Sequence, residues 1–513
     1  MSTPSLKFAS LGIAQVVSDH LPKLGITEPT EIQSKVIPLL VSNQQDVVIQ
    51  EKTGAGKTLS YCLPIITHLL NFDPHLRSRK TGTLALVIVP TRELVQQVYK
   101  VLLDVLKFRG SHWLVPGMLC GGENKNSEKS RLRKGINVLV TTPGRLLDHL
   151  KTTSCFKRDG LRFLVLDEAD RLLDMGFEKD LREIIFQLDV CGCRKILCSA
   201  TASPDLIDML ELQDPLFVST NSAANKITQQ CIYVDQRTRF LVLVALLKRI
   251  LKTTSKPKIV IFFSCCASVD FHFQLLSHFP NTNPDNEMIS KSSLLNQMLF
   301  RLHGNHAQAD RLKVYDKFMN SQGILLSTDV SARGLDMPNV THIIQFDVPS
   351  DYSDYIHRIG RTARIGASGS AVLFLMDHEK PYAELLEKDG HTLVTLNTKK
   401  MLSKHLECDD RRLNRRSDEE ITQITKFVDQ NLKQLAKDAF LSTVRAYTTH
   451  PSRMKHIFHV KKLHLGHLAK SFGLLAAPNE LAKHENVKEP KKSVKRKLVS
   501  EFDSAPFISK KKK

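Results

Sequence analysis

Short apolar runs rich in β-branched residues alternate with longer segments of helical period as far as about residue 385. Such alternation is typical of parallel sheets that are covered on both faces by helices. Two groups of runs flank the polar segment 219–226, which suits a linker. The predicted strands are 46–50, 83–89, 137–141, 163–166 and 195–198 in the first group, and 227–234, 258–263, 298–302, 323–326, 342–346 and 370–375 in the second. The polar segment 281–296 predicts a surface insertion before a strand.

The pattern changes after residue 385. Apolar residues at positions 421, 424, 428, 432, 435 and 439 follow steps of three or four. This spacing predicts one amphipathic helix over 417–446 that docks on another surface. The segment 441–470 contains six Lys or Arg and five His but no carboxylate, with Tyr447 and Phe458 among them. That composition favours an RNA-facing surface, although a helical brace whose cations face solvent is the alternative.

Positive charge is the feature of the composition that bears most on function. The 513 residues include 73 Lys or Arg against 53 Asp or Glu, a formal net charge of +20. The last 33 residues, 481–513, hold eleven of these cations and four of the carboxylates, without a helical or strand period. They predict a disordered basic tail that serves nuclear import or nucleic-acid binding, or that only solvates the chain. The remainder is still basic, which favours a polyanionic partner.

Apolar runs and cysteines argue against two other classes of protein. The longest runs, such as 84–89 and 241–247, fall far short of the roughly 20 residues that cross a bilayer, so we expect no membrane partner. The first residues lack the charged and apolar regions of a secretory signal. Ten cysteines are scattered along the chain, which indicates reduced intracellular thiols rather than a disulfide framework.

A phosphate-binding loop is predicted where a glycine-rich segment joins a strand to an apolar helix. The segment reads Gly54-Ala55-Gly56-Lys57-Thr58. Glycines let backbone N–H groups face a phosphate, and the start of the helix adds positive potential. Lys57 would reach the β- and γ-phosphates, and Thr58 would bind Mg²⁺. One position departs from the strict pattern, because Glu51 stands where that pattern has glycine.

An acidic motif, Asp167-Glu168-Ala169-Asp170, follows the predicted strand 163–166. Open α/β sheets bind ligands at the carboxyl ends of their strands. Asp167 is predicted to hold Mg²⁺ through water, and Glu168 to orient or deprotonate an attacking water. Alone, either motif has an ordinary interpretation, since acidic helix starts after strands are common. Together, about 110 residues apart and each at a strand end, they indicate a nucleotide-binding and hydrolysing site.

With these motifs the chain resembles a DEAD-box RNA helicase of superfamily 2, from Phe8 to about Leu375. The resemblance implies an α/β fold with two tandem RecA-like parallel-sheet domains, a mainly helical C-terminal extension and a disordered basic tail. The implied boundaries are 1–222, 223–385, 386–480 and 481–513. It also implies that Gln33 hydrogen-bonds the adenine edge, as an amide can both donate and accept, and that Phe8 supports the ring. Without the family, Gln33 is equally explained as a helix-surface residue.

The resemblance adds nucleotide contacts from the second domain. Asp336 is implied to contact the ribose, and Arg361 and Arg364 to reach the γ-phosphate as arginine fingers. Hydrolysis would then wait for the two domains to close. Without the family, a surface arginine run that forms ion pairs is the ordinary interpretation. The catalytic set is Lys57, Asp167, Glu168, Arg361 and Arg364, and the ATP-binding set is Phe8, Gln33, Thr53, Gly54, Ala55, Gly56, Lys57, Thr58, Gly334 and Asp336.

RNA-binding and coupling residues are also implied by the resemblance. The predicted RNA contacts are Pro90, Arg92, Gly121, Gly122, Thr142, Gly144, Arg145, Gln308, Arg311, Thr328 and Arg333. They are helix starts, glycine turns and arginines, which offer donors to phosphate whatever the base sequence; singly, each is also explained as a turn or cap. Ser199 and Thr201 would couple hydrolysis to strand separation, or form a capping turn. His357 is assigned to coupling, with a structural histidine as the equal alternative.

Residues beyond the two domains carry a finer resemblance. The segments 447–451, 455–460 and 463–474 resemble the C-terminal extension of nucleolar DEAD-box proteins, most of all the DEAD-box protein thirty-one type of large-subunit assembly. The resemblance implies an ATP- and Mg²⁺-dependent RNA helicase that opens short duplexes of pre-ribosomal RNA in pre-ribosomal particles, in the nucleolus of the nucleus. We expect a monomer that a protein cofactor assists. The alternatives are an ATP-gated RNA-clamping assembly factor with little unwinding, and a DNA helicase.

Pairs of metal-ligand residues occur at three places in the sequence. They are His456 with His459, His464 with His467, and Cys191 with Cys193. None of them offers four ligands at zinc spacing. We therefore expect no zinc site in these segments.

Overall fold

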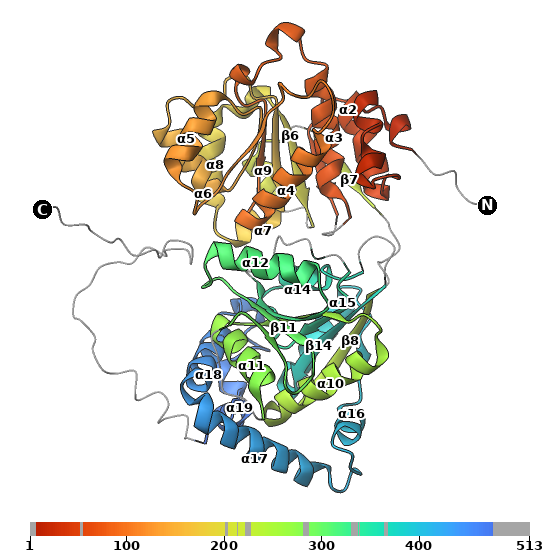
Figure 1. The fold of residues 1–513 in the computed structure, drawn as a ribbon, viewed down its shortest axis with the longest axis vertical. Coiled ribbons are helices and arrows are strands. Elements are labelled where there is room, and N and C mark those ends of the chain that lie inside the picture. The colour runs from red at the N-terminus through yellow and green to blue at the C-terminus, as the bar shows by residue number, and fades with distance from the viewer. Residues whose placement is uncertain are drawn as a thin grey trace, which may run out of the picture. The chain divides into compact units, whose positions relative to one another are not determined.

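The computed structural model describes residues 7–51, 55–200, 204–212, 214–220, 227–280, 287–329, 337, 339–363 and 368–475. The chain forms two compact units (Figure 1). The first comprises Met1–Thr228, Arg333–Ile343 and Asp351–Ala371, and the second Gln229–Ala332, Ile344–Ser350 and Val372–Lys513. Each unit is built around one sheet, which confirms the predicted pair of parallel-sheet folds.

The first unit contains a seven-stranded sheet in the order β3-β4-β2-β5-β6-β1-β7, and all of its pairs are parallel. Its strands are β1 (Val47–Gln50), β2 (Ala85–Ile88), β3 (Pro116–Leu119), β4 (Val138–Thr141), β5 (Phe163–Asp167), β6 (Arg194–Ser199) and β7 (Leu216–Ser219). Its helices are α1 (Gln15–Ser18), α2 (Glu31–Ser42), α3 (Lys57–Leu70), α4 (Arg92–Val105), α5 (Lys125–Lys134), α6 (Pro143–Thr152), α7 (Ala169–Asp174), α8 (Glu178–Leu188) and α9 (Pro204–Met209).

Both faces of this sheet are buried. Alternate residues of one strand enter different cores: Val47 and Ile49 pack with α2, α3 and α4, whereas Val48 packs with α6, α7 and α8. The reason is the two-residue period of a strand, which sends successive side chains to opposite faces. Because each face meets helices, the strand interiors need apolar residues at every position. The continuous apolar runs of the sequence are thereby explained.

Two strands of this sheet, β3 and β7, were not predicted. Both lie at the edges of the sheet. β3 begins with Pro116 and Gly117, residues that weaken a strand signal but are tolerated at an edge, where fewer ladder hydrogen bonds are needed. A Cβ on Gly117 would lie 2.5 Å from Ile136 Cδ1, so the glycine allows a close approach.

The second unit contains an eight-stranded sheet in the order β10-β11-β12-β9-β13-β14-β8-β15. Its strands are β8 (Ile227–Val234), β9 (Lys258–Phe263), β10 (Ile289–Lys291), β11 (Met298–Leu302), β12 (Gly323–Thr328), β13 (His342–Gln345), β14 (Gly369–Met376) and β15 (Val394–Thr395). Its helices are α10 (Arg239–Thr253), α11 (Cys266–His278), α12 (Gln308–Met319), α15 (Lys380–Lys388), α16 (Thr398–His405), α17 (Leu413–Asn431), α18 (Lys433–Thr448) and α19 (Leu465–Ser471). Helix α14 (Tyr352–Ile359) falls within the first unit, and β8, β13 and β14 each span a boundary between the two units.

The predicted insertion 281–296 contains a strand. β10 pairs antiparallel with β11 and forms the edge of the sheet. Its three residues, Ile289, Ser290 and Lys291, are too few to show a strand period. Residues 281–286 of the predicted insertion lie outside the described part of the chain.

The C-terminal extension shares one core with the second sheet. Val428 of α17, Phe440 of α18 and Phe472, which follows α19, pack in the same cluster as Phe263 and Phe346 of the sheet region. Helix α18 lies beside α11 (Figure 1). Burial of each such aromatic or aliphatic side chain stabilises the fold by roughly 1.5–3 kcal/mol. In the structure the extension is therefore a packed part of the second unit.

The single helix predicted over 417–446 is wrong, because the structure contains two helices there. α17 ends at Asn431 and α18 begins at Lys433, with Leu432 between them at φ −130°. The Asn431 side chain donates to the carbonyl of Phe427 at 3.0 Å, a local bond that competes with the helical ladder. Leu432 is buried at the break. The apolar spacing continued through the break, so the sequence pattern did not reveal it.

A buried polar contact ties the end of α18 to the sheet. The Tyr447 hydroxyl donates to Glu379 Oε1 at 2.8 Å, and the Met376 backbone N–H donates to Glu379 Oε2 at 2.8 Å. Burial raises the pKa of Glu379 to about 7 from its ordinary 4.5. Between those two values the folded chain holds a proton that the unfolded chain has released. The free energy of unfolding must therefore fall as pH rises through this window.

Replacing Glu379 with glutamine is expected to flatten this dependence. The amide accepts from Met376 N–H, and the Tyr447 hydroxyl can turn to accept from the amide nitrogen. A pKa shift of this size corresponds to about 3 kcal/mol at most between pH 5 and pH 8. Urea unfolding at four pH values measures it. Glu419→Gln, at an exposed carboxylate of α17, is the matched control and should retain the parent slope. Parallel profiles for the parent and Glu379→Gln would contradict the assignment.

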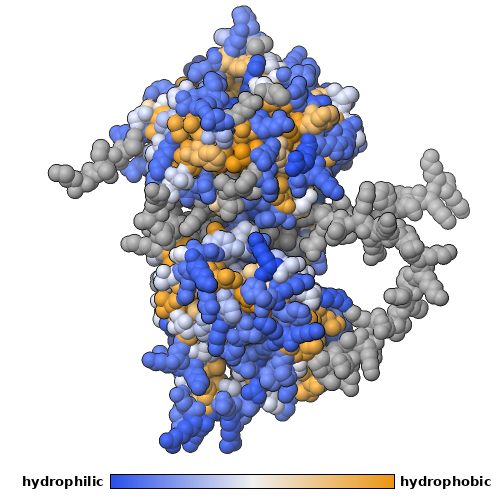
Figure 2. Space-filling model, turned by 180° about the vertical axis from the view of Figure 1, so that it is seen from behind, coloured by the Kyte–Doolittle hydropathy of each residue, from blue (hydrophilic) through white to orange (hydrophobic). Residues whose placement is uncertain are grey.

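No helix in the described part of the chain is both long and apolar enough to cross a bilayer. Figure 2 shows a surface on which hydrophilic side chains predominate and apolar ones gather in small groups. No disulfide occurs among the cysteines that the structure describes. The predicted basic tail, 481–513, lies outside the described residues.

Candidate nucleotide and RNA site

The predicted site residues of the first unit follow the carboxyl ends of its strands. Because parallel strands end at one edge of a sheet, that edge collects side chains that are far apart in sequence. The residues at this edge are Lys57 and Thr58 after β1, Pro90 and Arg92 after β2, Gly121 and Gly122 after β3, Thr142, Gly144 and Arg145 after β4, Asp167 and Glu168 at the end of β5, and Ser199 at the end of β6. Thr53, Gly54 and Thr201 lie outside the described residues.

The predicted phosphate loop leads into helix α3. Gly56 caps this helix with φ +93°, a left-handed conformation that favours glycine, and α3 begins at Lys57. A Cβ at Gly56 would lie 2.5 Å from Gln33 Nε2, so the loop also needs the missing side chain for packing. The start of α3 thus presents backbone N–H groups at the place where the motif predicts phosphate.

Lys57 and Glu51 close the loop from its two ends. Lys57 is buried, and its Nζ donates to the backbone carbonyl of Glu51 at 2.6 Å. The Glu51 carboxylate accepts a hydrogen bond from the hydroxyl of Thr220, beyond β7. Glu51 stands where the usual motif has glycine. Because its carboxylate is hydrogen-bonded to Thr220, the loop accommodates the larger side chain. To bind a nucleotide phosphate, the Lys57 ammonium would have to break its hydrogen bond to the Glu51 carbonyl.

The predicted adenine-binding segment is attached to the phosphate loop. Thr30 and Gln33 form a capping box at the start of α2, in which Gln33 Oε1 accepts from Thr30 N–H at 2.9 Å. Gln33 Nε2 donates to the Gly56 carbonyl at 3.1 Å, and Thr30 Oγ1 donates to the Ala55 carbonyl at 2.9 Å. The predicted contact with adenine would use the second N–H and the second lone pair of the Gln33 amide. Phe8, the predicted ring support, is buried in the adjoining core.

Asp167 is a buried carboxylate with two hydrogen-bond donors. The Tyr61 hydroxyl donates to Oδ2 and the Glu168 N–H donates to Oδ1, both at 2.9 Å. Burial raises the pKa of Asp167 to about 6, and Lys57 opposes the shift. A buried carboxylate with a raised pKa gains from a cation that stays beside it. Asp167 therefore fits the predicted role in holding Mg²⁺.

Glu168 has the opposite environment. It adopts a left-handed conformation, φ 50° and ψ 51°, at the start of α7. Its Oε2 accepts from Arg171 Nη1. Although burial alone would raise the pKa, neighbouring positive charges, Arg171 first among them, lower the pKa of Glu168 to about 2. Two adjacent carboxylates thus differ in pKa by about four units, which is typical of sites that give them different tasks.

The structure adds residues that the motifs did not single out. Tyr61, whose hydroxyl contacts Asp167, lies one helical turn after Lys57 on α3. That four-residue spacing places both side chains on the same face of the helix and could have identified Tyr61 from the sequence. Asp170 Oδ2 accepts from the Ala200 N–H at 3.0 Å, which links the acidic motif to the segment that includes Ser199. Arg171 is fully buried, and its Nε and Nη2 have no hydrogen-bond partner among the described residues. No sequence pattern pointed to Arg171.

Three of the predicted RNA contacts lie together. Thr91 caps helix α4 by accepting from the Leu94 N–H at 3.3 Å, and α4 begins with Arg92. The Arg92 guanidinium rests on the turn after β3: a Cβ at Gly121 would lie 2.5 Å from Arg92 Nη2, and one at Gly122 would lie 3.0 Å from Nη1. The absence of a Cβ at Gly121 and Gly122 thus leaves the space that the Arg92 guanidinium occupies.

Arg145 has structural partners. Its Nη2 donates to the Glu123 carbonyl at 2.8 Å, its Nε donates to the Cys120 carbonyl at 3.3 Å, and Nε lies 3.2 Å from Glu128 Oε2. It therefore holds both ends of the Gly121-Gly122 turn. An RNA phosphate would have to compete with these contacts, so the predicted contact by Arg145 stays a prediction.

Replacing Gly121 with alanine is expected to weaken RNA binding without unfolding the chain. The new methyl group would meet the far end of a flexible arginine, so Arg92 moves while the backbone stays in place. One displaced phosphate contact costs about 1–2 kcal/mol, or roughly five- to thirty-fold in affinity. Fluorescence anisotropy with labelled single-stranded RNA measures it. Gly192→Ala, where nothing lies within 4 Å, is the control. Equal RNA affinities in the two variants would contradict the role of Arg92.

The second unit holds the other predicted RNA contacts that the structure describes. Gln308 is the first residue of α12, and Arg311 follows one turn later and is buried. Thr328 ends β12, and its buried hydroxyl has no hydrogen-bond partner among the described residues. Arg333, Gly334, Asp336 and Arg364 lie outside the described residues.

His357 and Arg361 belong to one local element. His357 lies in the last turn of α14, and Arg361 Nε donates to the His357 carbonyl at 3.2 Å. Burial lowers the pKa of His357 to about 4, so the ring is neutral at pH 7. Neither ring nitrogen has a hydrogen-bond partner among the described residues. The predicted reach of Arg361 to a γ-phosphate stays a prediction.

A hollow of ≈ 570 Å³ opens at the other edge of the first sheet. Its lining includes Asp46, Phe163 and Arg194, which stand at the amino ends of β1, β5 and β6. The predicted nucleotide site lies at the carboxyl ends of the same strands. The two sites are therefore separate.

Together, the phosphate loop, the paired carboxylates and the two parallel sheets define a nucleotide-hydrolysing protein of the helicase class. Family models agree: residues 30–209 match the DEAD/DEAH box helicase model, 242–366 the helicase conserved C-terminal domain, and 429–480 the C-terminal extension of ATP-dependent rRNA helicases like SPB4. The chain belongs to the DEAD-box family of ATP-dependent RNA helicases. Its enzymatic activity is accordingly RNA-stimulated hydrolysis of ATP.

Individual relatives support this membership. DEAD-box ATP-dependent RNA helicase 17 of Oryza sativa subsp. japonica is 38% identical over 574 residues, which cover 98% of this chain and 96% of the rice protein. Human ATP-dependent DNA helicase DDX31 is 35% identical over 535 residues, 93% of this chain and 62% of the human one. The solved structure of the DEAD-box helicase Mss116 bound to ssRNA and UDP-BeF superposes with a TM-score of 0.75 at 25% identity, covering 94% and 96% of the two chains.

Proposed function

We propose that this helicase remodels pre-ribosomal RNA during assembly of the large ribosomal subunit, in the nucleolus, with ATP and Mg²⁺. The match of residues 429–480 to the C-terminal extension of an rRNA helicase carries the proposal. The basic surface residues of that extension and the net charge of +20 support a polyanionic partner. The enzyme acts as a monomer within pre-ribosomal particles and takes a protein cofactor.

Mg²⁺ fits the residues at the carboxyl edge of the first sheet. Thr58 offers a hydroxyl at the start of α3, and Asp167 a buried carboxylate whose raised pKa reflects uncompensated burial. Bound there with ATP, Mg²⁺ would neutralise charge on the phosphate oxygens. Lys57 holds the β- and γ-phosphates, and Glu168, ionised at neutral pH, orients the attacking water.

RNA is held through its backbone. Arg92 and the glycine turn beside it offer a guanidinium and backbone donors, which contact phosphate irrespective of base sequence. Contacts to the 2′-hydroxyl would distinguish RNA from DNA. ATP and a single strand both bind the closed arrangement of the domains better than the open one, so each ligand raises the affinity for the other. Bending of the bound strand then opens a short duplex, and release of phosphate resets the enzyme.

Two assays test the proposal. Displacement of a short RNA duplex with ATP should occur in the parent and be lost in Lys57→Ala, which removes the phosphate-binding ammonium. Crosslinking in cells, followed by sequencing of the bound fragments, should recover pre-ribosomal RNA. Fragments drawn mainly from messenger RNA would overturn the ribosomal assignment and leave the family unaffected.

Two other functions give different results in the same assays. An RNA-clamping assembly factor would hydrolyse ATP with RNA and displace no duplex; the extension packed on the second sheet, with its exposed Lys455, Lys461 and Lys462, favours recruitment of this kind. A DNA helicase, as the name of the human relative reads, would be stimulated equally by DNA.

A further inference from the structure

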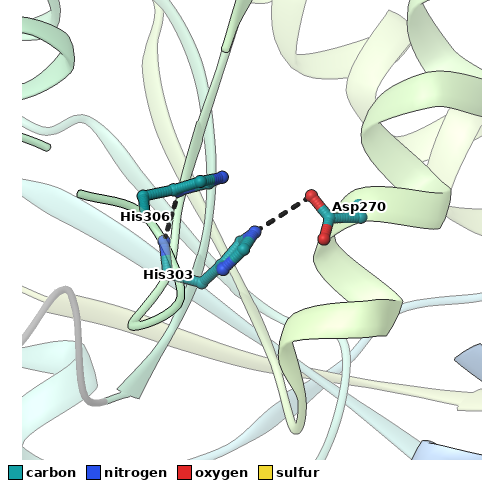
Figure 3. Close-up of side chains that lie close together, drawn as sticks. All are labelled: Asp270, His303 and His306. Carbon is teal, nitrogen blue, oxygen red and sulfur yellow. Dashed lines mark hydrogen bonds and ion pairs between the residues drawn. The ribbon is translucent and has the colours of Figure 1, made fainter. Parts of the chain in front are cut away.

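Three side chains with metal-ligand atoms meet in the second unit. Asp270, His303 and His306 each place one such atom within 4.8 Å of the other two (Figure 3). His303 Nε2 lies 2.9 Å from Asp270 Oδ1. In a tetrahedral zinc site the ligand atoms lie about 3.3 Å apart. The cluster therefore approaches the size that such a site requires.

One helix and one loop hold the cluster. Asp270 projects from helix α11, and His303 and His306 follow strand β11, three residues apart, in the connection to α12. Figure 3 shows the two rings on the connection facing the carboxylate on the helix. All three residues belong to the second unit. The cluster is thus assembled by the fold of that unit alone.

The contacts inside the cluster leave ligand capacity unused. Arg301 Nη1 and His303 Nε2 both bond to Asp270 Oδ1, at 2.8 and 2.9 Å, which leaves Oδ2 available. His303 is 2% exposed, and its Nδ1 has no hydrogen-bond partner among the described residues. His306 Nδ1 accepts from the His303 N–H at 3.4 Å, which is a long hydrogen bond, and the two ring centroids lie 3.7 Å apart.

The hydrogen bond between His303 and Asp270 marks the place that a cation would take. His303 Nε2 lies 2.9 Å from Asp270 Oδ1, and both groups bind metals in their deprotonated form, so a bound ion would replace the shared proton. Arg301 Nη1 donates to the same carboxylate at 2.8 Å and would serve as a second partner for the ligating group.

We propose that Asp270, His303 and His306 form a binding site for a transition-metal ion of the Zn²⁺ class, with water in the fourth position. Imidazole with a single carboxylate suits Zn²⁺ better than Mg²⁺, which prefers oxygen ligands. The bound ion joins α11 to the connection that leads into α12, the helix with Gln308 and Arg311. It therefore fixes the start of a predicted RNA-binding helix.

Cobalt titration of the untagged, metal-free, full-length chain without nucleotide tests the proposal. Co²⁺ in a tetrahedral site gives a strong visible absorption, whereas Co²⁺ in an octahedral oxygen site, such as the predicted Mg²⁺ site, absorbs weakly. We expect one tetrahedral Co²⁺ per chain, which one equivalent of Zn²⁺ displaces. His306→Ala and Asp270→Asn should each lower the affinity about ten-fold or more.

A second histidine pair supplies the matched control. His464 and His467 have the same spacing, and their ring centroids lie 3.9 Å apart, but they belong to no carboxylate-containing cluster among the described residues. The double variant His464→Ala/His467→Ala should bind Co²⁺ like the parent. Thermal unfolding confirms that each variant is folded. Absence of the tetrahedral band up to about 100 µM Co²⁺, or equal affinity in the parent and in folded His306→Ala, would overturn the proposal and leave the cluster an ion-pair network.

Discussion

Replacing Glu168 with glutamine is expected to lower RNA-stimulated ATP turnover by about 10²–10⁴-fold while ATP and RNA still bind. The amide keeps the size of the side chain and one acceptor for Arg171, so the start of α7 remains in place. It lacks the negative charge that orients an attacking water and accepts its proton. With hydrolysis blocked, ATP and RNA should remain together on the enzyme.

The contrast between the two carboxylates explains why this effect should be specific. Burial raises the pKa of Asp167 to about 6, whereas Arg171 and other positive charges lower the pKa of Glu168 to about 2. Asp167 gains from a cation, and Glu168 is already ionised and hydrogen-bonded to a guanidinium. In the proposed role, so weak a base would contribute more by orienting the water than by removing its proton.

Single-turnover hydrolysis and retention of labelled RNA on the enzyme measure the two halves of this prediction. Glu183→Gln is the control, because Glu183 lies on the surface, where it pairs with Lys151 at 2.7 Å and accepts from Gln187 Nε2 at 3.2 Å. Exposed pairs of this kind contribute little. Normal turnover in Glu168→Gln together with normal turnover in Lys57→Ala would defeat the assignment of the whole nucleotide site.

The sequence could predict those strands whose two faces are both buried. β9 and β11, which are buried almost throughout, have the bounds that their apolar runs predicted, and so does the partly buried β8. The strands that were missed, β3, β7, β10 and β15, are short and include both edges of each sheet, where burial is incomplete and Pro or polar residues are tolerated. The break at Leu432 was missed for another reason, since the helical spacing runs through it and only the local bond of Asn431 marks it.

For the candidate site, local motifs predicted which residues lie at the carboxyl edge but not what they contact. Gln33 was expected on adenine, and the structure shows its amide on the Gly56 carbonyl. Arg145 was expected on RNA, and its guanidinium holds the glycine turn. These partners come from other strands and helices, so no spacing along the chain encodes them. The same holds for Asp270 and His303, which come together only through the packing of α11 beside β11.

Replacing Arg361 with alanine is expected to lower RNA-stimulated ATP turnover by about 10³-fold or more, with ATP binding to the first unit preserved. Arg361 follows helix α14, and its Nε donates to the His357 carbonyl at 3.2 Å, which ties the guanidinium to the end of that helix. A guanidinium delivered to the γ-phosphate stabilises charge that develops only during hydrolysis, so its loss should appear in turnover rather than in affinity.

Arg361→Lys should rescue little of this loss, because an ammonium cannot reproduce the planar, bidentate contact of a guanidinium with phosphate. Arg416→Ala is the matched control, since Arg416 forms an exposed ion pair with Glu419 at 2.8 Å. Fluorescent ATP analogues report binding, and phosphate release with saturating RNA reports turnover. Undiminished turnover in Arg361→Ala would show that ATP is hydrolysed without this arginine. Coupling of RNA to hydrolysis would then have to reside at the first sheet, in the link between Asp170 and Ala200.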